Sequence, residues 1–376
     1  MTRTALAAIV AAALFVCAPA MAKTYKASTS VPATHDTVTE GFDVFSRNIE
    51  KATDGEIKVK LFAGGVLLGP KAVLDGLNDR IVEFAYVITG YFPAQLPYTG
   101  GMLKEMSIIG TNVAIVAAAT SELVMLNCQP CLDENLKHGH VVTGMNAYPP
   151  MVVMSKSPIA TPEDFRSKKI RSGGGLWDRY LEQLGATPVN IPSTDQYEAL
   201  DRNVLDATMH LAPSLKNDSL WDMVTDVTML RLGVWRAVNG VAVNTKTWKS
   251  FTPEQRKQIL VAANEARINE AFTYIRQGVD VVEEAKKRGI RFHEPEGALL
   301  ENLTAFTRTE TAGAAERSKT QHGVPNADEL FAKMQALVDK YQAIFDEVGG
   351  DQAKFTERAR QELVEKIDTT TFGVVN

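Results

Sequence analysis

The sequence has few of the features that mark redox, metal or nucleic-acid proteins. Its 376 residues include only three cysteines and six histidines. Lys and Arg total 40 against 45 Asp and Glu, and the resulting formal net charge of −5 argues against nucleic acid as a partner. After residue 22 no apolar run is long enough to cross a bilayer. The chain is therefore expected neither to bind nucleic acid nor to span a membrane.

Catalytic and cofactor motifs are also missing. The sequence contains no G-x-S-x-G, no H-E-x-x-H and no recognisable Cys/His nucleophile arrangement. A glycine-rich turn at residues 64–71 has Pro70 where a phosphate loop needs Lys, and no Ser or Thr follows Lys71. We therefore predict no cofactor and no enzyme activity, and a secreted enzyme stays only as an alternative.

The N-terminus reads as a secretory signal. Residues 1–22 carry one charge, Arg3, then an apolar core, then Ala20-Met21-Ala22 as an A-x-A cleavage site. Cys17 lacks the small preceding residues that a lipid-attachment signal requires. The mature chain is expected to begin near Lys23 in the periplasm.

The pattern of the mature chain predicts an α/β protein. Expected strands alternate with expected helices in a βαβαβ order, which favours a parallel sheet: strands at 25–27, 57–62 and 83–89, helices ending near 53 and at 71–79. The length suggests two domains. A capping box with Pro at the first helical position, Thr252-Pro253-Glu254-Gln255, begins a helix that ends before Gly289. At roughly 50 Å this helix is too long for one small domain.

One stretch points to a ligand. Lys169-Ile170-Arg171 predicts a short strand that ends at Ser172 and three glycines. An arginine at the carboxyl end of a strand stands where α/β proteins usually bind ligands, and its planar fork suits a carboxylate. The alternative is a surface arginine paired with Asp164 or Asp178.

The order of elements around Arg171 resembles the periplasmic solute-binding subunits of tripartite ATP-independent periplasmic (TRAP) transporters, the DctP family. The resemblance rests on residues 157–165, 169–171, 184–189, 197–200 and 204–207, and it extends loosely from about Tyr25 to Gly289. It implies two lobes with a ligand cleft between them, a long bracing helix and closure about a hinge. It also implies that Arg171 binds a small organic carboxylate, which is delivered to a TRAP membrane permease. An ABC-type solute receptor is the rival binding protein, and the long helix favours the TRAP class.

The resemblance divides the mature chain into two lobes. Residues 23–147 and 237–277 are expected to form lobe I, and residues 148–236 and 278–376 lobe II. Residues 296–369 are mostly helical by pattern and are expected to pack on lobe II.

Further ligand contacts are expected near the cleft. In the family an asparagine that contacts the ligand commonly occupies the position of His210, and a histidine retains a hydrogen-bond donor there. Aromatic side chains at strand ends are candidates for the wall, although each could instead belong to the core. The complete set of candidates is Arg171, His210, Trp177, Trp235, Tyr91, Ser172, His35 and Arg236.

The ligand class follows from the number of cations. Many relatives carry a second ligand-binding arginine just before the first strand of lobe II, where this chain reads Tyr148-Pro149-Pro150-Met151. A second buried carboxylate without a cation is unfavourable by several kcal/mol. We therefore predict a monocarboxylate, aromatic or hydroxylated, over a C4-dicarboxylate. Arg236 turning inward, or a protonated His210, would weaken this prediction.

The two cysteines outside the signal form a C-x-x-C motif. Cys128 and Cys131 are followed by His138 and His140, a set that could bind zinc. A redox pair normally starts a helix after a strand, whereas this pair follows a helix. Because disulfides persist in an exported protein, we expect a structural disulfide and no metal, with zinc and redox use as the alternatives.

Overall fold

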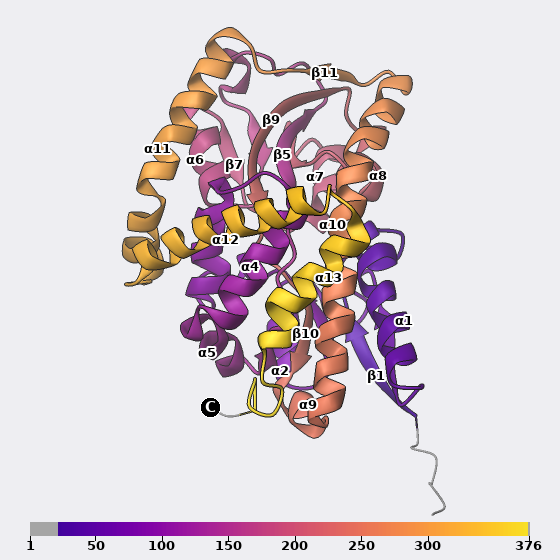
Figure 1. Cartoon of the computed structure of the whole chain (residues 1–376). Coiled ribbons are helices and arrows are strands. Elements are labelled where there is room, and N and C mark those ends of the chain that lie inside the picture. Colours follow the sequence, from indigo (N-terminus) through magenta and orange to yellow (C-terminus); the bar gives the residue numbers. More distant parts are fainter. Residues whose placement is uncertain (1–21, 375–376) are drawn as a thin grey trace, which may run out of the picture.

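The computed structural model describes residues 22–374, and the predicted signal lies, apart from residue 22, outside the described residues. Figure 1 shows two α/β lobes, one built around β1 and β10 and the other around β5 and β9. The chain passes from one lobe to the other after β4, after β9 and again between β10 and β11. The predicted two-lobed α/β fold is confirmed.

Lobe I contains a five-stranded sheet in the order β2-β1-β3-β10-β4. Its strands are β1 (Lys23–Ser28), β2 (Ile57–Phe62), β3 (Phe84–Val87), β4 (His140–Val141) and β10 (Asn239–Asn244). β1 pairs in parallel with β2 and β3, whereas β10 runs antiparallel to β3 and β4. The connecting helices are η1 (Thr37–Phe42) with α1 (Asp43–Ala52), and α2 (Val73–Asn78). The βαβαβ start predicted from the sequence is therefore present.

Lobe II contains a six-stranded sheet in the order β11-β9-β5-β8-β6-β7. Its strands are β5 (Tyr148–Ser155), β6 (Lys169–Arg171), β7 (Thr187–Val189), β8 (Ala207–Leu211), β9 (Asp226–Trp235) and β11 (Arg291–His293). β5 runs antiparallel to both β8 and β9. The helices of this lobe are α6 (Leu176–Gln183), α7 (Gln196–Asp201) and α8 (Ser214–Asn217).

The long helix α10 (Pro253–Lys287) braces both lobes. The predicted capping box forms, because the Thr252 side chain accepts from the Gln255 backbone and the Gln255 side chain accepts in return. Near its start Ile259 packs into the core of lobe I, and near its end Val281 and Ala285 pack into a separate core under the lobe II sheet. Figure 1 shows α10 running past both sheets. One continuous helix thus connects the two halves mechanically.

The C-terminal helices are α11 (Gly297–His322), α12 (Ala327–Glu347) and α13 (Gln352–Leu363). The expectation that residues 296–369 pack on lobe II is met by α11, whose Phe306 ring lies 4.8 Å from that of Tyr180. It is not met by α12 and α13, which lie against α4 (Val113–Leu126) and α10. Lys340 of α12 donates to Glu122 of α4 at 2.7 Å.

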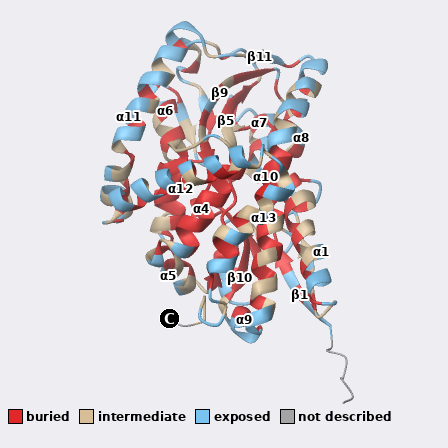
Figure 2. Ribbon diagram, in the orientation of Figure 1, coloured by how far each residue is buried: buried red, intermediate tan, exposed pale blue. Residues whose placement is uncertain are grey.

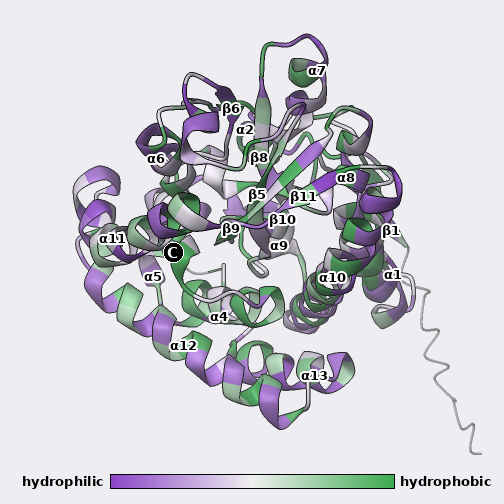
Figure 3. Cartoon of the chain, turned by 90° about the horizontal axis from the view of Figure 1, so that it is seen from above, coloured by the Kyte–Doolittle hydropathy of each residue, from purple (hydrophilic) through white to green (hydrophobic). Residues whose placement is uncertain are grey.

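The reason for this arrangement is that α4 is apolar on nearly every side. All but its last residue are buried, and a helix that is hydrophobic all round needs neighbours on every face. Figure 2 shows α4 as buried, and Figure 3 shows the largely hydrophobic α4 between α12 and the sheets. Within residues 22–374 no single helix has the length and apolarity of a membrane span; α4 and α5 (Gln129–Lys137) have them only as a pair bent by 80°.

Cys128 and Cys131 form the expected disulfide. Both residues are buried, and Cys128 is the N-cap of α5, where its sulfur accepts from the Cys131 backbone. The pair starts α5, and the preceding element is the helix α4 and not a strand, as the sequence argument stated. Since the sulfurs are bonded to each other, they are not free thiolates for zinc.

Candidate ligand-binding site

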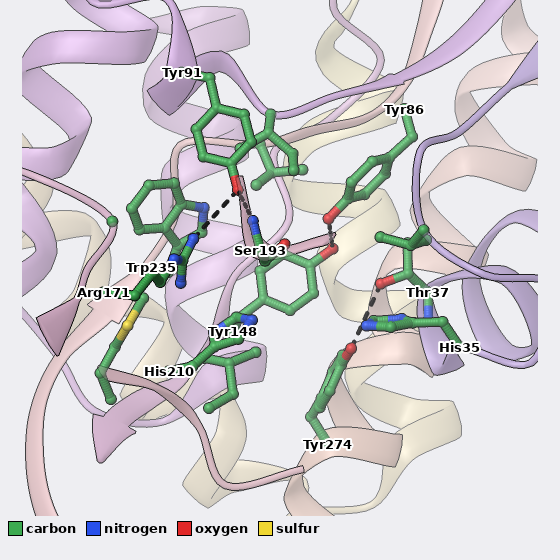
Figure 4. A pocket seen from close by; sticks show the side chains of 16 residues that line it. His35, Thr37, Tyr86, Tyr91, Tyr148, Arg171, Ser193, His210, Trp235 and Tyr274 are labelled. Atoms are coloured by element: carbon green, nitrogen blue, oxygen red, sulfur yellow. Dashed lines mark hydrogen bonds between the residues drawn. The ribbon is translucent and has the colours of Figure 1, made fainter. Parts of the chain in front are cut away.

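A cavity lies between the two lobes (Figure 4). Residues of both lobes line it: Val31, His35, Thr37, Tyr86, Ile88, Tyr91, Val238 and Tyr274 with Tyr148, Met151, Arg171, Gly173, Ser193, His210, Leu211 and Trp235. It leaves about 50 Å³ for the centres of water-sized molecules, where one water needs roughly 10–15 Å³. The space is therefore sufficient for a ligand group larger than a single water.

Arg171 ends β6 and points into this cavity although only 2% of the residue is exposed. Its Nε donates to the Ile191 carbonyl at 3.1 Å, and its Nη1 and Nη2 lie 3.5 Å from the Met209 carbonyl and the Tyr91 hydroxyl. Within residues 22–374 no acidic side chain forms an ion pair with it. A buried charge of this kind is costly unless an anion compensates it.

The alternative of a surface arginine paired with Asp164 or Asp178 is wrong. Asp164 accepts hydrogen bonds from the backbone of Ala160 and Thr161 as part of a capping box. Asp178 accepts from the hydroxyl of Ser172. Both carboxylates are thus occupied at helix starts, and the guanidinium is left to the cavity.

His210, in β8, lies beside Arg171 in the cavity wall. Burial, the positive charge of Arg171 and the neighbouring His35 hold the pKa of His210 well below its usual range. Its Nε2 is 3.6 Å from Asp218, and its buried Nδ1 has no hydrogen-bond partner among residues 22–374. His210 is therefore a neutral hydrogen-bonding group, and it does not act as a second cation.

His35 lines the cavity from lobe I. Its Nδ1 accepts from the Thr37 backbone N–H at 3.1 Å, and burial lowers its pKa. The neutral ring must then carry its proton on Nε2.

Trp235 and Tyr91 form an aromatic wall. Their ring centroids are 6.4 Å apart. One glycine from each lobe packs closely against the Trp235 ring. A Cβ added at Gly90 or at Gly173 would lie only 2.6 Å from the indole. Tyr91, in η2 (Thr89–Tyr91) of lobe I, accepts from the backbone N–H of Ser193 in lobe II at 3.1 Å. The wall therefore includes a polar contact across the cleft.

Three predicted residues do not line the cavity. Trp177 is fully buried behind Trp235, with ring centroids 5.3 Å apart, and its indole N–H donates to the Leu232 carbonyl at 2.7 Å. It belongs to the core because α6 packs its inner face on the sheet.

Ser172 and Arg236 also point elsewhere. Besides donating to Asp178, the Ser172 hydroxyl accepts from the Gly174 N–H at 3.0 Å, so it stabilises the turn into α6. Arg236 is fully buried, and its Nη2 donates to the carbonyl of Ile109. Burial lowers its pKa to about 9. The arginine that might have served a second carboxylate therefore lies outside the cavity lining.

Sequence reasoning missed a polar cluster on the lobe I side of the cavity. The Tyr86 hydroxyl donates to the Tyr148 hydroxyl at 2.7 Å, and Tyr148 donates to Glu270 Oε1 at 3.0 Å. Thr37 donates to the same oxygen at 2.7 Å, and Asn146 donates to Oε2 at 2.6 Å. Burial raises the pKa of Glu270 to about 7.

One signal for this cluster was present in the sequence. Tyr148, the first residue of β5, lies in the stretch where the resemblance to the family implies an arginine in many relatives. Tyr86 and Tyr274 gave none, because they lie on β3 and α10, far apart in the sequence, and only the tertiary structure places both in the cavity lining.

Two lobes joined by crossing strands, with a buried arginine facing the cavity between them, are the architecture of a two-lobed solute-binding protein. The model of the bacterial extracellular solute-binding proteins, family 7 (DctP), matches residues 28–312, and the chain belongs to this family. The predicted family is confirmed.

Two sequence relatives illustrate the range of the family. The outer membrane transporter protein TsaT of Comamonas testosteroni is 25% identical over 304 residues, 79% of this chain and 86% of TsaT. The ectoine-binding periplasmic protein TeaA of Halomonas elongata is 25% identical over 228 residues, 59% of this chain and 64% of TeaA.

Solved structures share the fold. A marine metagenome TRAP solute-binding protein specific for aromatic acids, in complex with 3-hydroxybenzoate, superposes with a TM-score of 0.75 at 20% identity, over 85% of this chain and 99% of that one. A TRAP solute-binding protein of Bordetella bronchiseptica with bound (R)- and (S)-mandelate gives a TM-score of 0.71 at 21% identity, with the same two coverages.

Proposed function

We propose that this protein is exported, captures a small organic monocarboxylate between its lobes and delivers it to a TRAP-type membrane permease. The observation that carries the proposal is the buried guanidinium of Arg171, which faces the cavity without an acidic partner among the described residues. A carboxylate bound by two parallel hydrogen bonds would supply the missing charge.

The charges around the cavity favour one carboxylate. His210 is neutral, and Arg236 does not reach the lining. A second carboxylate would therefore be buried without a cation, which costs several kcal/mol. Solved relatives with bound 3-hydroxybenzoate and mandelate hold ligands with a single carboxylate.

Capture by closure about a hinge is supported by the contacts of Tyr91. This lobe I side chain reaches both Arg171 and Ser193 of lobe II. The contacts form only when the lobes approach each other, so they would be made and broken as the cleft closes and opens.

The family and its structural relatives are binding proteins, and no turnover is proposed. A TRAP permease is the proposed partner because the solved relatives are subunits of TRAP systems. The signal at residues 1–22 would place the protein in the periplasm.

The test is to identify the ligand that co-purifies with the protein. Protein expressed with its signal is isolated from the periplasm, denatured gently, and the released small molecules are identified by mass spectrometry, with the Arg171→Ala variant processed in parallel. A monocarboxylate released by the parent protein and depleted in the variant is expected. A ligand without a carboxylate, or equal amounts from both proteins, would overturn the proposal.

A further inference from the structure

The side of the cavity away from Arg171 carries hydroxyl groups connected to a buried carboxylate, next to the His35 ring. Figure 4 shows Arg171 and Tyr91 on one side, and Tyr86, Thr37 and Tyr274 on the other. All of these side chains line the cavity. Glu270 lies behind the hydroxyls and outside the lining, on α10.

The positions of the hydroxyl protons follow from counting donors. Each hydroxyl has one proton to donate. Tyr148 donates its proton to Glu270, so in its 2.7 Å contact with Tyr86 it must accept. Thr37 also donates to Glu270, so in its 3.4 Å contact with Tyr274 it must accept as well.

An ionised Glu270 therefore aligns two short chains of hydrogen bonds. One runs from Tyr86 through Tyr148 to the carboxylate, and the other runs from Tyr274 through Thr37. All four protons point toward Glu270. The outermost oxygens, those of Tyr86 and Tyr274, are left with only lone pairs for a further partner.

This arrangement decides what a ligand can place there. A hydroxyl or N–H group would complete the two chains. Against the oxygens of Tyr86 and Tyr274, an ether, a halogen or a second carboxylate would place lone pairs against lone pairs, with the negative charge of Glu270 behind them. Such a mismatch in a buried site is costly, because neither side can form its hydrogen bond.

We propose that the cavity selects acids that carry a hydrogen-bond donor, a hydroxyl or an N–H, at the end away from the carboxylate, with Tyr86 and Tyr274 as its acceptors. This rests on the proposed function, since it takes the carboxylate to be held by Arg171. It adds a requirement that neither the arginine nor the aromatic wall imposes.

The test compares acids that differ only in the donor. Two matched sets are used: 3-hydroxybenzoate, 3-methoxybenzoate and benzoate, then 3-hydroxyphenylacetate, 3-methoxyphenylacetate and phenylacetate. Affinities are measured by calorimetry at pH 8.5, where Glu270, with its pKa about 7, is largely ionised. In the set that binds better, the hydroxy acid should bind on the order of 10- to 100-fold more tightly than its methyl ether.

Tyrosine-to-phenylalanine variants show which hydroxyls cause the preference for the hydroxy acid. Tyr86→Phe and Tyr274→Phe each remove one acceptor, and the ratio of hydroxy-acid to methyl-ether affinity should fall toward one in at least one of them. Tyr180→Phe is the matched control, because this tyrosine lies outside the cavity lining and its buried hydroxyl has no hydrogen-bond partner in the described part of the chain. Its ratio should stay at the parent value.

The outcomes separate this inference from the proposed function. If acids bind and Arg171→Ala weakens them, but the hydroxy acid and its ether bind equally, the donor requirement is wrong and carboxylate capture stands. A preference that survives in both Tyr→Phe variants also overturns the inference. If none of the six acids binds, the donor requirement is overturned and the proposed function is decided by the co-purified ligand; if acids bind and Arg171→Ala changes nothing, both proposals fail.

Discussion

The hydroxyl of Tyr91 in lobe I lies 3.5 Å from Nη2 of Arg171 in lobe II. The same oxygen accepts from the Ser193 backbone N–H at 3.1 Å. The guanidinium proposed to hold the ligand is thus in contact with the opposite lobe, and ligand binding and lobe closure share one contact.

Arg171 is expected to dominate affinity. Arg171→Ala should weaken binding of the co-purified acid by roughly 2–5 kcal/mol, because the anion would be buried without its partner. Arg171→Lys should recover little, since a point charge cannot reproduce the planar fork. Calorimetry measures both, and Arg202→Ala, at an exposed arginine on the same lobe, controls for net charge. Near-parent affinity in the alanine variant would rule out the clamp.

Tyr91→Phe should mainly increase the rate of ligand release. The substitution removes the hydroxyl that contacts Arg171 and Ser193 but keeps the ring against Trp235. The binding free energy should weaken by about 1 kcal/mol. This loss should raise the dissociation rate more than it lowers the association rate. Stopped-flow fluorescence reports both rates, with the half-exposed Tyr197→Phe as control. An unchanged dissociation rate would show that the hydroxyl does not hold the closed form.

Gly173→Ala should impair the site by steric contact alone. The added Cβ would lie 2.6 Å from the Trp235 ring, so the indole must move into or away from the cavity. We expect weaker binding with little loss of secondary structure, measured by calorimetry and circular dichroism. Gly278→Ala is the control, because a Cβ there meets no atom within 4 Å. Parent affinity in Gly173→Ala would contradict the assigned position of the tryptophan.

The disulfide should be present and stabilising. Intact mass with and without reductant should differ by two hydrogens, and purified protein should hold no stoichiometric zinc. For so short a loop the chain-entropy contribution is about 2 kcal/mol, so a Cys128→Ala, Cys131→Ala double variant should unfold at lower urea concentration. Two free thiols in periplasmic protein, or one bound zinc, would contradict this prediction.

Glu270 should make stability depend on pH. Its folded pKa is raised by burial from 4.5 to about 7, so its protonated form is favoured by folding. This contribution is complete below the unfolded pKa and is lost as pH rises through the folded pKa. Hydrogen bonds from Thr37, Tyr148 and Asn146 oppose this rise in pKa, and the negative charge of the Asp36 carboxylate adds to it.

Comparison with Glu270→Gln isolates this effect. Between pH 4.5 and pH 8 the parent should lose roughly 3 kcal/mol of unfolding free energy relative to the variant. Urea denaturation across this range gives both profiles. Profiles that stay parallel would mean that Glu270 titrates normally.

Local signals in the sequence determined much of the fold and one central feature of the site. The capping box at Thr252 and the βαβαβ order appear in the structure as predicted. These features depend on residues close in sequence, so periodicity and caps suffice to read them. The position of Arg171 in the cavity was predicted from its place at the end of a short strand.

Only the tertiary structure decided which side chains share the cavity. Trp177 and Trp235 looked equivalent in the sequence, yet one lies in the core behind the other. Glu270 and Tyr148 meet across 122 positions. Such a contact depends on how α10 packs against β5. Burial, hydrogen-bond direction and the shifted pKa of Glu270 exist only once this packing has excluded water, because each depends on neighbours that the local sequence does not specify.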